Sequence, residues 1–344
     1  MAAAANNGKR KVVTVLPLHI DTTSFTNPQQ PITYPWRRII NKRQLPFLIL
    51  FVFFVFSIAI NFIQHERHRG VLSKTSSLSF PIHDPLPRPP LDKLQRAIIV
   101  PGHAIHTGDS SLEGLEMDDN WILESFQRGG QVRTFVRHIE KAVAMAKEDP
   151  EAVVIFSGGQ TRVHAGPQSE GQSYWSIANS LIHKENNNND NSTIDSLATR
   201  MIVEDYARDS YENVLFSICR FQEMTGNYPS SITVVGFEFK RKRFEEMHLP
   251  SLRYPEQQFR YIGIDPPFDP VGASERSAGE AANSLGPFKK DPYGCHYPLV
   301  QKRIDRNPFR RRHPYRLTCP ALSDIINYCP EDNQFFQGPL PWNS

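Results

Sequence analysis

Short apolar runs alternate with amphipathic stretches over residues 97–262, and this alternation sets the fold class. Between the runs, apolar residues recur at helical spacing over 132–146, 174–182 and 214–224. Strands that are apolar on both faces and alternate with helices are typical of a parallel sheet covered on both sides. We therefore expect an α/β fold, a Rossmann-like three-layer α/β/α sandwich with a mostly parallel sheet. The expected strands are 97–100, 153–156, 201–203, 232–235 and 259–262.

An uncharged, strongly apolar run begins at Leu45 and ends at Ile63. A helix of about 19 residues spans roughly 28 Å, close to the ~30 Å hydrocarbon core of a bilayer. The run begins too late for a cleaved signal peptide, and no small-residue cleavage pattern follows it. The sequence therefore predicts one transmembrane helix, with the lipid bilayer as a partner of the chain.

Charge is distributed unevenly around this run. The whole chain has a net charge of +3, yet the tail before Leu45 carries a single acidic residue, Asp21. Basic flanks stay on the cytosolic side, which predicts a single-pass type II protein whose C-terminal domain lies in a lumen. Because short spans suit thin early-secretory membranes, we expect the Golgi or the endoplasmic reticulum, with a mitochondrial membrane as the alternative. The basic residues of the tail are Lys9, Arg10, Lys11, Arg37, Arg38, Lys42 and Arg43.

Two further features agree with a luminal domain. Asn191 begins an Asn-Ser-Thr glycosylation sequon in an Asn-rich stretch where a loop is expected. All four cysteines follow the apolar run, and an oxidising lumen permits disulfides. Cys219 lies in a helical pattern and is expected in the core, whereas Cys319 and Cys329 are the candidate disulfide. Buried free thiols are the alternative, because sequence alone does not give the pairing.

The remaining boundaries follow from composition. Residues 1–44 form the cytosolic basic tail, 45–63 the span and 64–95 a Pro- and Ser-rich stem. Residues 96–286 hold the α/β domain, and 287–344 form an irregular, Pro- and Arg-rich C-terminal extension. No basic surface interleaved with aromatic residues indicates nucleic acid as a partner.

Glycines and polar residues follow the ends of the expected strands, at the rim where ligands of such sheets bind. Unhindered N–H groups at Gly158 and Gly159 suit a phosphate or carboxylate, and Glu204, at a strand end, suits a ligand contact or a general base. The ligand-binding candidates are Gly102, His103, Ser157, Gly158, Gly159, Gln160, Thr161, Ser210 and Arg243. The catalytic candidates are Glu170, Glu204, Glu212 and Asn213.

Several candidates also have a purely structural interpretation. Gly158 and Gly159 could simply turn the chain sharply. Asp209 and Glu212 have the spacing of a capping box, with Asp209 as the N-cap. Glu170 could be an ordinary first-turn acid favoured by the helix dipole. These readings explain the residues without any chemistry.

The sequence contains few residue patterns that indicate metal or cofactor binding. His103 and His106 have H-x-x-H spacing, but no third ligand is evident, so no metal site is predicted. The basic stretch 240–243 could form a solvated face, with Arg243 as the residue best placed to hold an anion. No cofactor can be named from these patterns.

The order of these features resembles the YdcF-like family, which includes the bacterial envelope proteins SanA and ElyC. The likeness covers roughly residues 96–265 and rests on the turn at Gly102, the Ser157-Gly158-Gly159 triplet, Glu170, the segment 204–213 and Arg243. It implies a eukaryotic, membrane-anchored member with a Rossmann-like fold and a cleft formed by these residues. It also implies nucleotide-type ligands such as S-adenosylmethionine, or a role in envelope polysaccharide or lipid-carrier metabolism.

Three functions stay open at this point. The first is an enzyme that binds and acts on a phosphate-bearing or nucleotide-like substrate, by transfer or hydrolysis. The second is a non-catalytic binding or scaffold module in glycan or envelope metabolism. The third is a Golgi glycosyltransferase, which the order of tail, anchor and stem favours. The spaced carboxylate pair that binds manganese in such enzymes is missing, which counts against the third.

Overall fold

A computed structural model describes residues 51–62, 91–185, 191–267 and 270–343. The chain divides into two compact units, residues 1–79 and 80–344. In the first unit, residues 51–62 form a helix with exposed apolar side chains. Within the described residues, no helix has both the length and the apolar character needed to cross a membrane. The rest of the predicted span, the tail and most of the stem lie outside the described residues.

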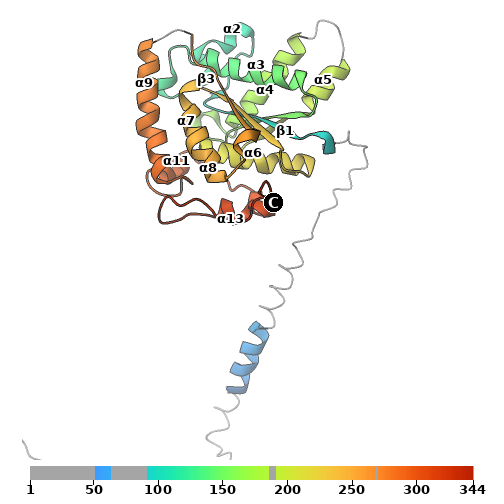
Figure 1. Cartoon of the computed structure of the whole chain (residues 1–344), viewed down its shortest axis with the longest axis vertical. Coiled ribbons are helices and arrows are strands. Elements are labelled where there is room, and N and C mark those ends of the chain that lie inside the picture. Colours follow the sequence, from blue (N-terminus) through green and yellow to red (C-terminus); the bar gives the residue numbers. More distant parts are fainter. Residues whose placement is uncertain (1–50, 63–90, 186–190, 268–269, 344) are drawn as a thin grey trace, which may run out of the picture. The chain divides into compact units, whose positions relative to one another are not determined.

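The second unit is built on a parallel five-stranded sheet (Figure 1). Each expected strand is present and all neighbouring pairs are parallel, which confirms the α/β class. The order in the sheet is β5-β4-β1-β6-β7. The strands are β1 (Arg96–Pro101), β4 (Ala152–Ser157), β5 (Met201–Glu204), β6 (Ser231–Gly236) and β7 (Phe259–Gly263).

The strand order has a switch point between β1 and β6. From β1 the chain moves outward through β4 to β5, then returns to the other side of β1 and moves outward again through β6 to β7. Connections that leave two adjacent strands in opposite directions open a crevice beyond their carboxyl ends, where ligands of such sheets bind. The turns after β1 and β6 therefore define the place to look for a site.

Helices cover both faces of the sheet (Figure 1). α3 (Val132–Glu148) and α4 (Glu170–Glu185) pack on one face, where their apolar sides join Ile98 and Val100 in a core. α6 (Ser210–Thr225) and α8 (Leu249–Leu252) pack on the other face, with Ala97 and Ile99. Alternate residues of β1 thus face opposite cores, which explains its unbroken apolar sequence.

The ends of α6 follow from local sequence. Asp209 is the N-cap, and its carboxylate accepts a hydrogen bond from the Glu212 N–H, as expected. The second hydrogen bond of a capping box would run from the Asp209 N–H to the Glu212 carboxylate. This part of the prediction is wrong, because the Glu212 carboxylate accepts from the Arg208 N–H instead. Gly226 ends the helix in the left-handed conformation, with φ of 79°.

The helical segment after β6 differs from its prediction. From the sequence alone, residues 241–247 are predicted to form a short helix that is ended by Pro250. In the structure, α7 (Arg241–Arg243) runs through a π-helical turn (Phe244–His248) directly into α8, and Pro250 lies in the first turn of α8. Pro250 therefore does not stop the helical run, and it lies just after the π-helical turn, where the regular hydrogen-bond pattern of the α-helix is already interrupted.

Several short elements were not expected from the sequence. Asn191, expected in a loop, begins α5 (Asn191–Ala198). β2 (Ile105–His106) and β3 (Trp121–Ile122) form a small antiparallel pair after β1. The remaining α-helices are α2 (Leu112–Leu115), α9 (Pro270–Glu280), α10 (Gly286–Lys290), α11 (Leu299–Asp305), α12 (Tyr315–Thr318) and α13 (Ser323–Ile326).

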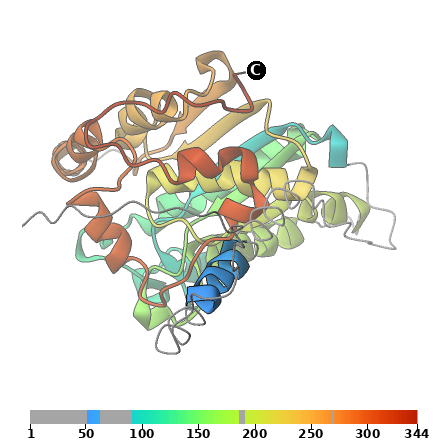
Figure 2. The ribbon, with the colours of Figure 1, turned by 90° about the horizontal axis from the view of Figure 1, so that it is seen from below.

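The C-terminal extension is part of the folded unit. α11, α12 and α13 all lie within it, and its chain, in red, runs along the body of the unit (Figure 2). Its buried side chains, among them Leu299, Tyr315 and Leu322, belong to the same core as α6. Removal of the extension would therefore expose one face of the domain.

The disulfide joins Cys295 to Cys329, so the predicted bridge between Cys319 and Cys329 is wrong. The Cα atoms of the bridged pair are 5.9 Å apart, a normal separation for a disulfide. Cys319 is buried and free, as is Cys219, which lies in the core as expected. The bridge closes a loop within the extension, from just after α10 to the stretch beyond α13.

Candidate functional site

A cleft of about 1130 Å³ lies at the carboxyl ends of β1 and β6. Of the sequence candidates, it is lined by Gly102, His103, Glu170, Ser210, Asn213 and Arg243. The extension contributes Lys302, Asp305 and Arg306. The segment after β3 contributes Glu124 and residues 126–131. Basic side chains outnumber acidic ones in this lining, which favours an anionic ligand.

His103 and Lys240 meet across the switch point. Lys240 Nζ lies 3.3 Å from His103 Nδ1, and His103 stacks on Phe237 with ring centroids 5.0 Å apart. The backbone of His103 is fixed on both sides, since its N–H donates to the Tyr174 hydroxyl and its carbonyl accepts from Gln127 Nε2. The pair is therefore held rigidly where the crevice opens.

Lys240 is a cation in an unfavourable environment. Burial, together with the nearby Arg243 and Arg306, lowers the pKa of Lys240 to about 7. Burial and Lys240 itself lower the pKa of His103 well below its ordinary value, so the imidazole is neutral. Among the described residues, no carboxylate lies within ion-pair distance of Lys240 Nζ. An anionic ligand would supply the negative charge that Lys240 lacks as a partner.

Arg243 extends the positive surface. Its side chain is buried and pairs with Glu280 of α9, with Nε and Oε1 3.2 Å apart. That contact does not have hydrogen-bond geometry, and Arg243 Nε has no hydrogen-bond partner among the described residues. A guanidinium with donors to spare can contact a phosphate in addition to its carboxylate partner.

Glu170 is the carboxylate best placed for chemistry. It is 8% exposed, lines the cleft and accepts a hydrogen bond from Thr161 Oγ1. A side chain at Gly102 would place its Cβ 2.5 Å from Glu170 Cβ, and one at Gly158 would come within 2.8 Å. These two glycines are therefore needed to admit the Glu170 side chain between the turns after β1 and β4.

The predicted anion cradle at Gly158 and Gly159 is wrong. The Gly158 N–H donates to the Glu204 carbonyl at 3.0 Å, and the Gly159 N–H donates to the Ala207 carbonyl at 2.7 Å. Both groups are already paired within the fold, so neither is available to a ligand. Gln160 is likewise occupied, because its Nε2 donates to the Pro167 carbonyl.

Glu204 lies beneath the cleft and is fully buried. Its carboxylate accepts from the Tyr206 and Ala207 N–H groups and from the Ser157 and Tyr315 hydroxyls. Burial, which outweighs these bonds, raises the pKa of Glu204 to about 7. Ser157 also lies 2.9 Å from Asn213 Oδ1, so a protonated Glu204 can donate to Ser157 while Ser157 donates to Asn213. Glu204 and Ser157 thus support the cleft wall and do not line it.

Glu212 belongs to a charge network at the edge of the cleft, in which Arg208 and Asp209 line the cleft. It pairs with Arg208 through two nitrogens and lies 3.4 Å from Arg303 Nε. The same Arg303 Nε lies 2.6 Å from Asp209 Oδ2. Although burial opposes it, Arg303 holds the pKa of Asp209 below its ordinary value. Glu212 therefore binds the extension through Arg303. Gly294 leaves room for the Arg303 guanidinium, since a side chain at this position would place its Cβ 2.6 Å from Arg303 Nη2.

Lys240, as the central cation, and the residues that the extension adds to the cleft lining could not be predicted from the sequence patterns. Lys240 stood among four consecutive basic residues, and nothing in their spacing marks the one that faces inward. Lys302 and Arg306 come from a segment with no resemblance to any nucleotide-binding motif. Their separation of four residues at the end of α11 was the available signal, because residues four apart share a face of a helix.

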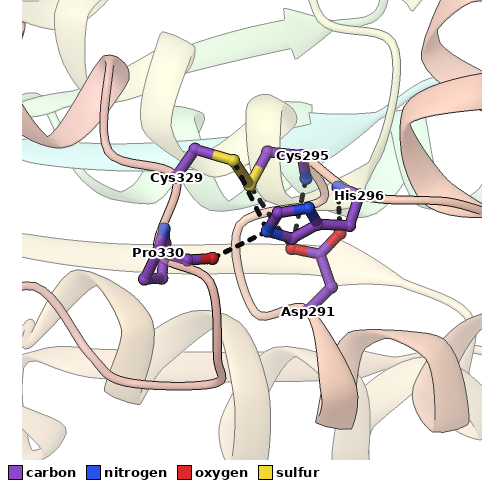
Figure 3. Close-up of a disulfide and its surroundings, with 5 residues drawn as sticks. All are labelled: Asp291, Cys295, His296, Cys329 and Pro330. Carbon is purple, nitrogen blue, oxygen red and sulfur yellow. Dashed lines mark hydrogen bonds between the residues drawn. A yellow bond between two sulfur atoms is a disulfide. The ribbon is translucent and has the colours of Figure 1, made fainter. Parts of the chain in front are cut away.

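One cluster of metal-ligand type occurs among the described residues, and it lies outside the cleft. Cys295, His296 and Cys329 have ligand atoms within 4.8 Å of one another (Figure 3). In this structure the two sulfurs form the disulfide, and His296 Nε2 lies 2.7 Å from the Pro330 carbonyl oxygen. The Asp291 carboxylate accepts from the Cys295 and His296 N–H groups and orders the turn. His103 and His106 do not form a joint site, since His106 contacts the Asp109 carbonyl.

The fold and the cleft together define a class of protein, a doubly wound α/β domain with a cleft at its switch point that is lined by more basic than acidic side chains. The chain belongs to the same family as the uncharacterized protein YOR238W of Saccharomyces cerevisiae. The two sequences are 30% identical over 302 aligned residues, which cover 74% of this chain and 99% of the yeast protein. No family profile matches the chain, and no solved structure matches it significantly.

Proposed function

We propose that the cleft binds a phosphate-bearing or nucleotide-like ligand and acts on it by transfer or hydrolysis. The observation that carries this proposal is the placement of Lys240 at the switch point, next to His103 and Arg243, with no carboxylate partner among the described residues. A cleft of about 1130 Å³ has room for a nucleotide-sized molecule. The aromatic rings of Phe126, Phe237 and Phe239 in its lining suit the apolar part of such a ligand.

Glu170 is the proposed general base. The other buried carboxylates in the lining are engaged, since Glu280 pairs with Arg243 and Asp209 pairs with Arg303. Glu170 is held by the Thr161 hydroxyl alone among the described residues, and it faces the same space as Lys240. A carboxylate so placed can take a proton from a water or hydroxyl nucleophile while the cations hold the phosphate. A non-catalytic binding module would use the cations and have no need of Glu170.

The same proposal includes the setting of the domain. We propose a single-pass type II protein anchored through residues 45–63, with the domain in the lumen of the Golgi or endoplasmic reticulum, and membership of the YdcF-like family. The Cys295–Cys329 disulfide supports an oxidising compartment, and the switch-point cleft supports the family. Protection of the domain from protease in sealed microsomes would support this topology, and its digestion there would contradict it.

Two variants separate binding from reaction in the full-length protein. Lys240→Met should weaken sulfate binding by about ten- to hundredfold, because a charged hydrogen bond contributes roughly 1.5–3 kcal/mol. Glu170→Gln should keep sulfate binding and lose phosphate release from a panel of nucleoside monophosphates, diphosphates and triphosphates. Titration calorimetry measures the first effect and a phosphate assay the second.

The matched control is Lys242→Met, which removes an exposed lysine of α7, two residues after Lys240, the N-cap of that helix. Sulfate binding and melting temperature should both stay at the wild-type value in this control. Equal sulfate affinity in Lys240→Met and Lys242→Met would overturn the binding proposal. Phosphate release that survives in Glu170→Gln would remove the general-base role and favour another acid.

A further inference from the structure

A small pocket of about 50 Å³ adjoins the cleft on the side of the extension. It shares most of its lining with the cleft, including Arg243 from α7, Lys302 from α11 and Arg306 at the end of α11. Ser210 at the start of α6, with Asn283 and Ser284 after α9, adds polar uncharged groups, and Phe288 and Leu299 add apolar side chains. Three cations from two distant parts of the chain therefore converge on one enclosed space.

Neither extension cation is neutralised by an acid within the described residues. Lys302 Nζ donates to the Asn283 carbonyl, and Arg306 Nη1 donates to the Arg208 carbonyl at 3.0 Å. The carboxylate in the pocket lining belongs to Asp209, which is paired with Arg303. The ammonium and the two guanidinium groups keep further N–H donors for a ligand.

The cations crowd one another. Burial, followed by the charges of Arg306 and Arg243, lowers the pKa of Lys302. The same two arginines contribute to the low pKa of Lys240. Like charges gathered in a partly buried site favour the binding of an anion that carries more than one negative charge.

The size of the pocket limits what can enter. A cavity needs about 10–15 Å³ of this kind of volume to hold one water, so a space of about 50 Å³ holds a group of about four or five heavy atoms, the size of a phosphate. A terminal phosphate fits this limit and can accept from cations and hydroxyls at once. The remainder of the ligand would lie in the adjoining cleft.

We infer that this pocket is a subsite for a terminal, dianionic phosphate, so that the ligand class is a phosphomonoester. The inference rests on the proposed function and specifies its ligand. It gives the C-terminal extension a direct part in recognition, because Lys302 and Arg306 would contact the phosphate. A phosphodiester, with one negative charge and a second substituent, would fit the pocket poorly.

The test measures binding of phenyl phosphate and of its diester, methyl phenyl phosphate, to the full-length protein by titration calorimetry. Lys302→Gln and Arg306→Gln should each weaken phenyl phosphate binding at least tenfold and change diester binding by less than threefold. Arg312→Gln, an exposed arginine of the same extension, is the matched control and should bind both like the wild type. Because Arg306 also holds the Arg208 carbonyl, Lys302→Gln gives the cleaner result if Arg306→Gln fails to fold.

The outcomes separate this inference from the proposed function. Unchanged phenyl phosphate binding in Lys302→Gln, together with its loss in Lys240→Met, would overturn the subsite and leave the proposed function standing. Unchanged binding in all these variants would overturn both. Competition with inorganic phosphate distinguishes a site for the free phosphate ion from a site for a phosphate ester. A pocket for the free ion alone would bind inorganic phosphate as tightly as phenyl phosphate.

Discussion

Replacing Arg303 by methionine is expected to lower the free energy of unfolding by about 3–5 kcal/mol. Methionine keeps much of the length of the side chain and removes its charge. The change leaves the Asp209 carboxylate buried without its ion-pair partner and takes one of two cations from Glu212. Because Arg303 joins the extension to the start of α6, the loss should also weaken ligand binding at the cleft. Urea unfolding of the purified protein measures the effect.

Arg312→Met is the matched control for this prediction. Arg312 is an exposed arginine of the same extension, and its replacement should change the free energy of unfolding by less than about 0.5 kcal/mol. Asp209→Asn combined with Arg303→Met should recover part of the loss, since the amide carries no charge. Equal stability of Arg303→Met and Arg312→Met would show that the buried network contributes nothing.

Replacing Glu204 by leucine is expected to cost about 3–5 kcal/mol at pH 5, because the Tyr206 and Ala207 N–H groups lose their acceptor. The cost should shrink as pH rises through about 7, where the wild type itself loses stability. Glu204→Gln should behave differently. An amide imitates most of the protonated acid, with its NH₂ group donating to Ser157 and its oxygen accepting from Tyr206. Of the two N–H groups, Ala207 alone loses its acceptor, because it shares the Glu204 oxygen that bonds Ser157. The glutamine variant should therefore fold, and it should keep sulfate binding.

The glutamine variant also makes a prediction about pH. The pKa of Glu204 is raised by burial from its ordinary value near 4.5 to about 7 in the folded protein. A raised carboxyl pKa contributes stability that is present at low pH and lost as pH rises through the folded-state pKa. Relative to Glu204→Gln, the wild type should lose up to about 3 kcal/mol between pH 5 and pH 8.

Denaturant titrations at pH 5, 6, 7 and 8 test this behaviour. Glu113→Gln, an exposed glutamate on α2, is the control and should run parallel to the wild type. A constant difference between the wild type and Glu204→Gln would mean that Glu204 keeps one charge state over this range. Loss of turnover without loss of stability in Glu204→Gln would restore its role as a general base.

The strands could be predicted because a strand buried on both faces must be apolar throughout. The edge of the sheet that carries the cleft could be predicted as well, since parallel strands bring their carboxyl ends together. This is why Gly102, His103 and Glu170, from two separate turns, lie side by side at the cleft. Periodicity and turn chemistry are local properties, and local properties can be read from a sequence.

The internal partners of the candidate residues could not be predicted. Glu204 and Gly159 are residue types that often occur in ligand-binding sites, yet their polar groups are paired inside the fold. Glu204, for example, accepts a hydrogen bond from Tyr315 of the distant extension. The same limit applies to the cysteines. Cys295 pairs with Cys329 because the turn ordered by Asp291 brings them together, and spacing along the chain gives no sign of it. These features depend on contacts between segments far apart in sequence.

The sulfate titration, repeated between pH 6 and pH 9 on the wild type and Lys240→Met, tests the central claim most directly. Sulfate keeps its charge over this range, so any change belongs to the protein. Because Lys240 loses its proton as pH rises through about 7, wild-type affinity should fall by about ten- to hundredfold overall. The variant should bind weakly at every pH, with little slope. Wild-type binding that does not change with pH and equals that of Lys240→Met would contradict an anion site at the switch point.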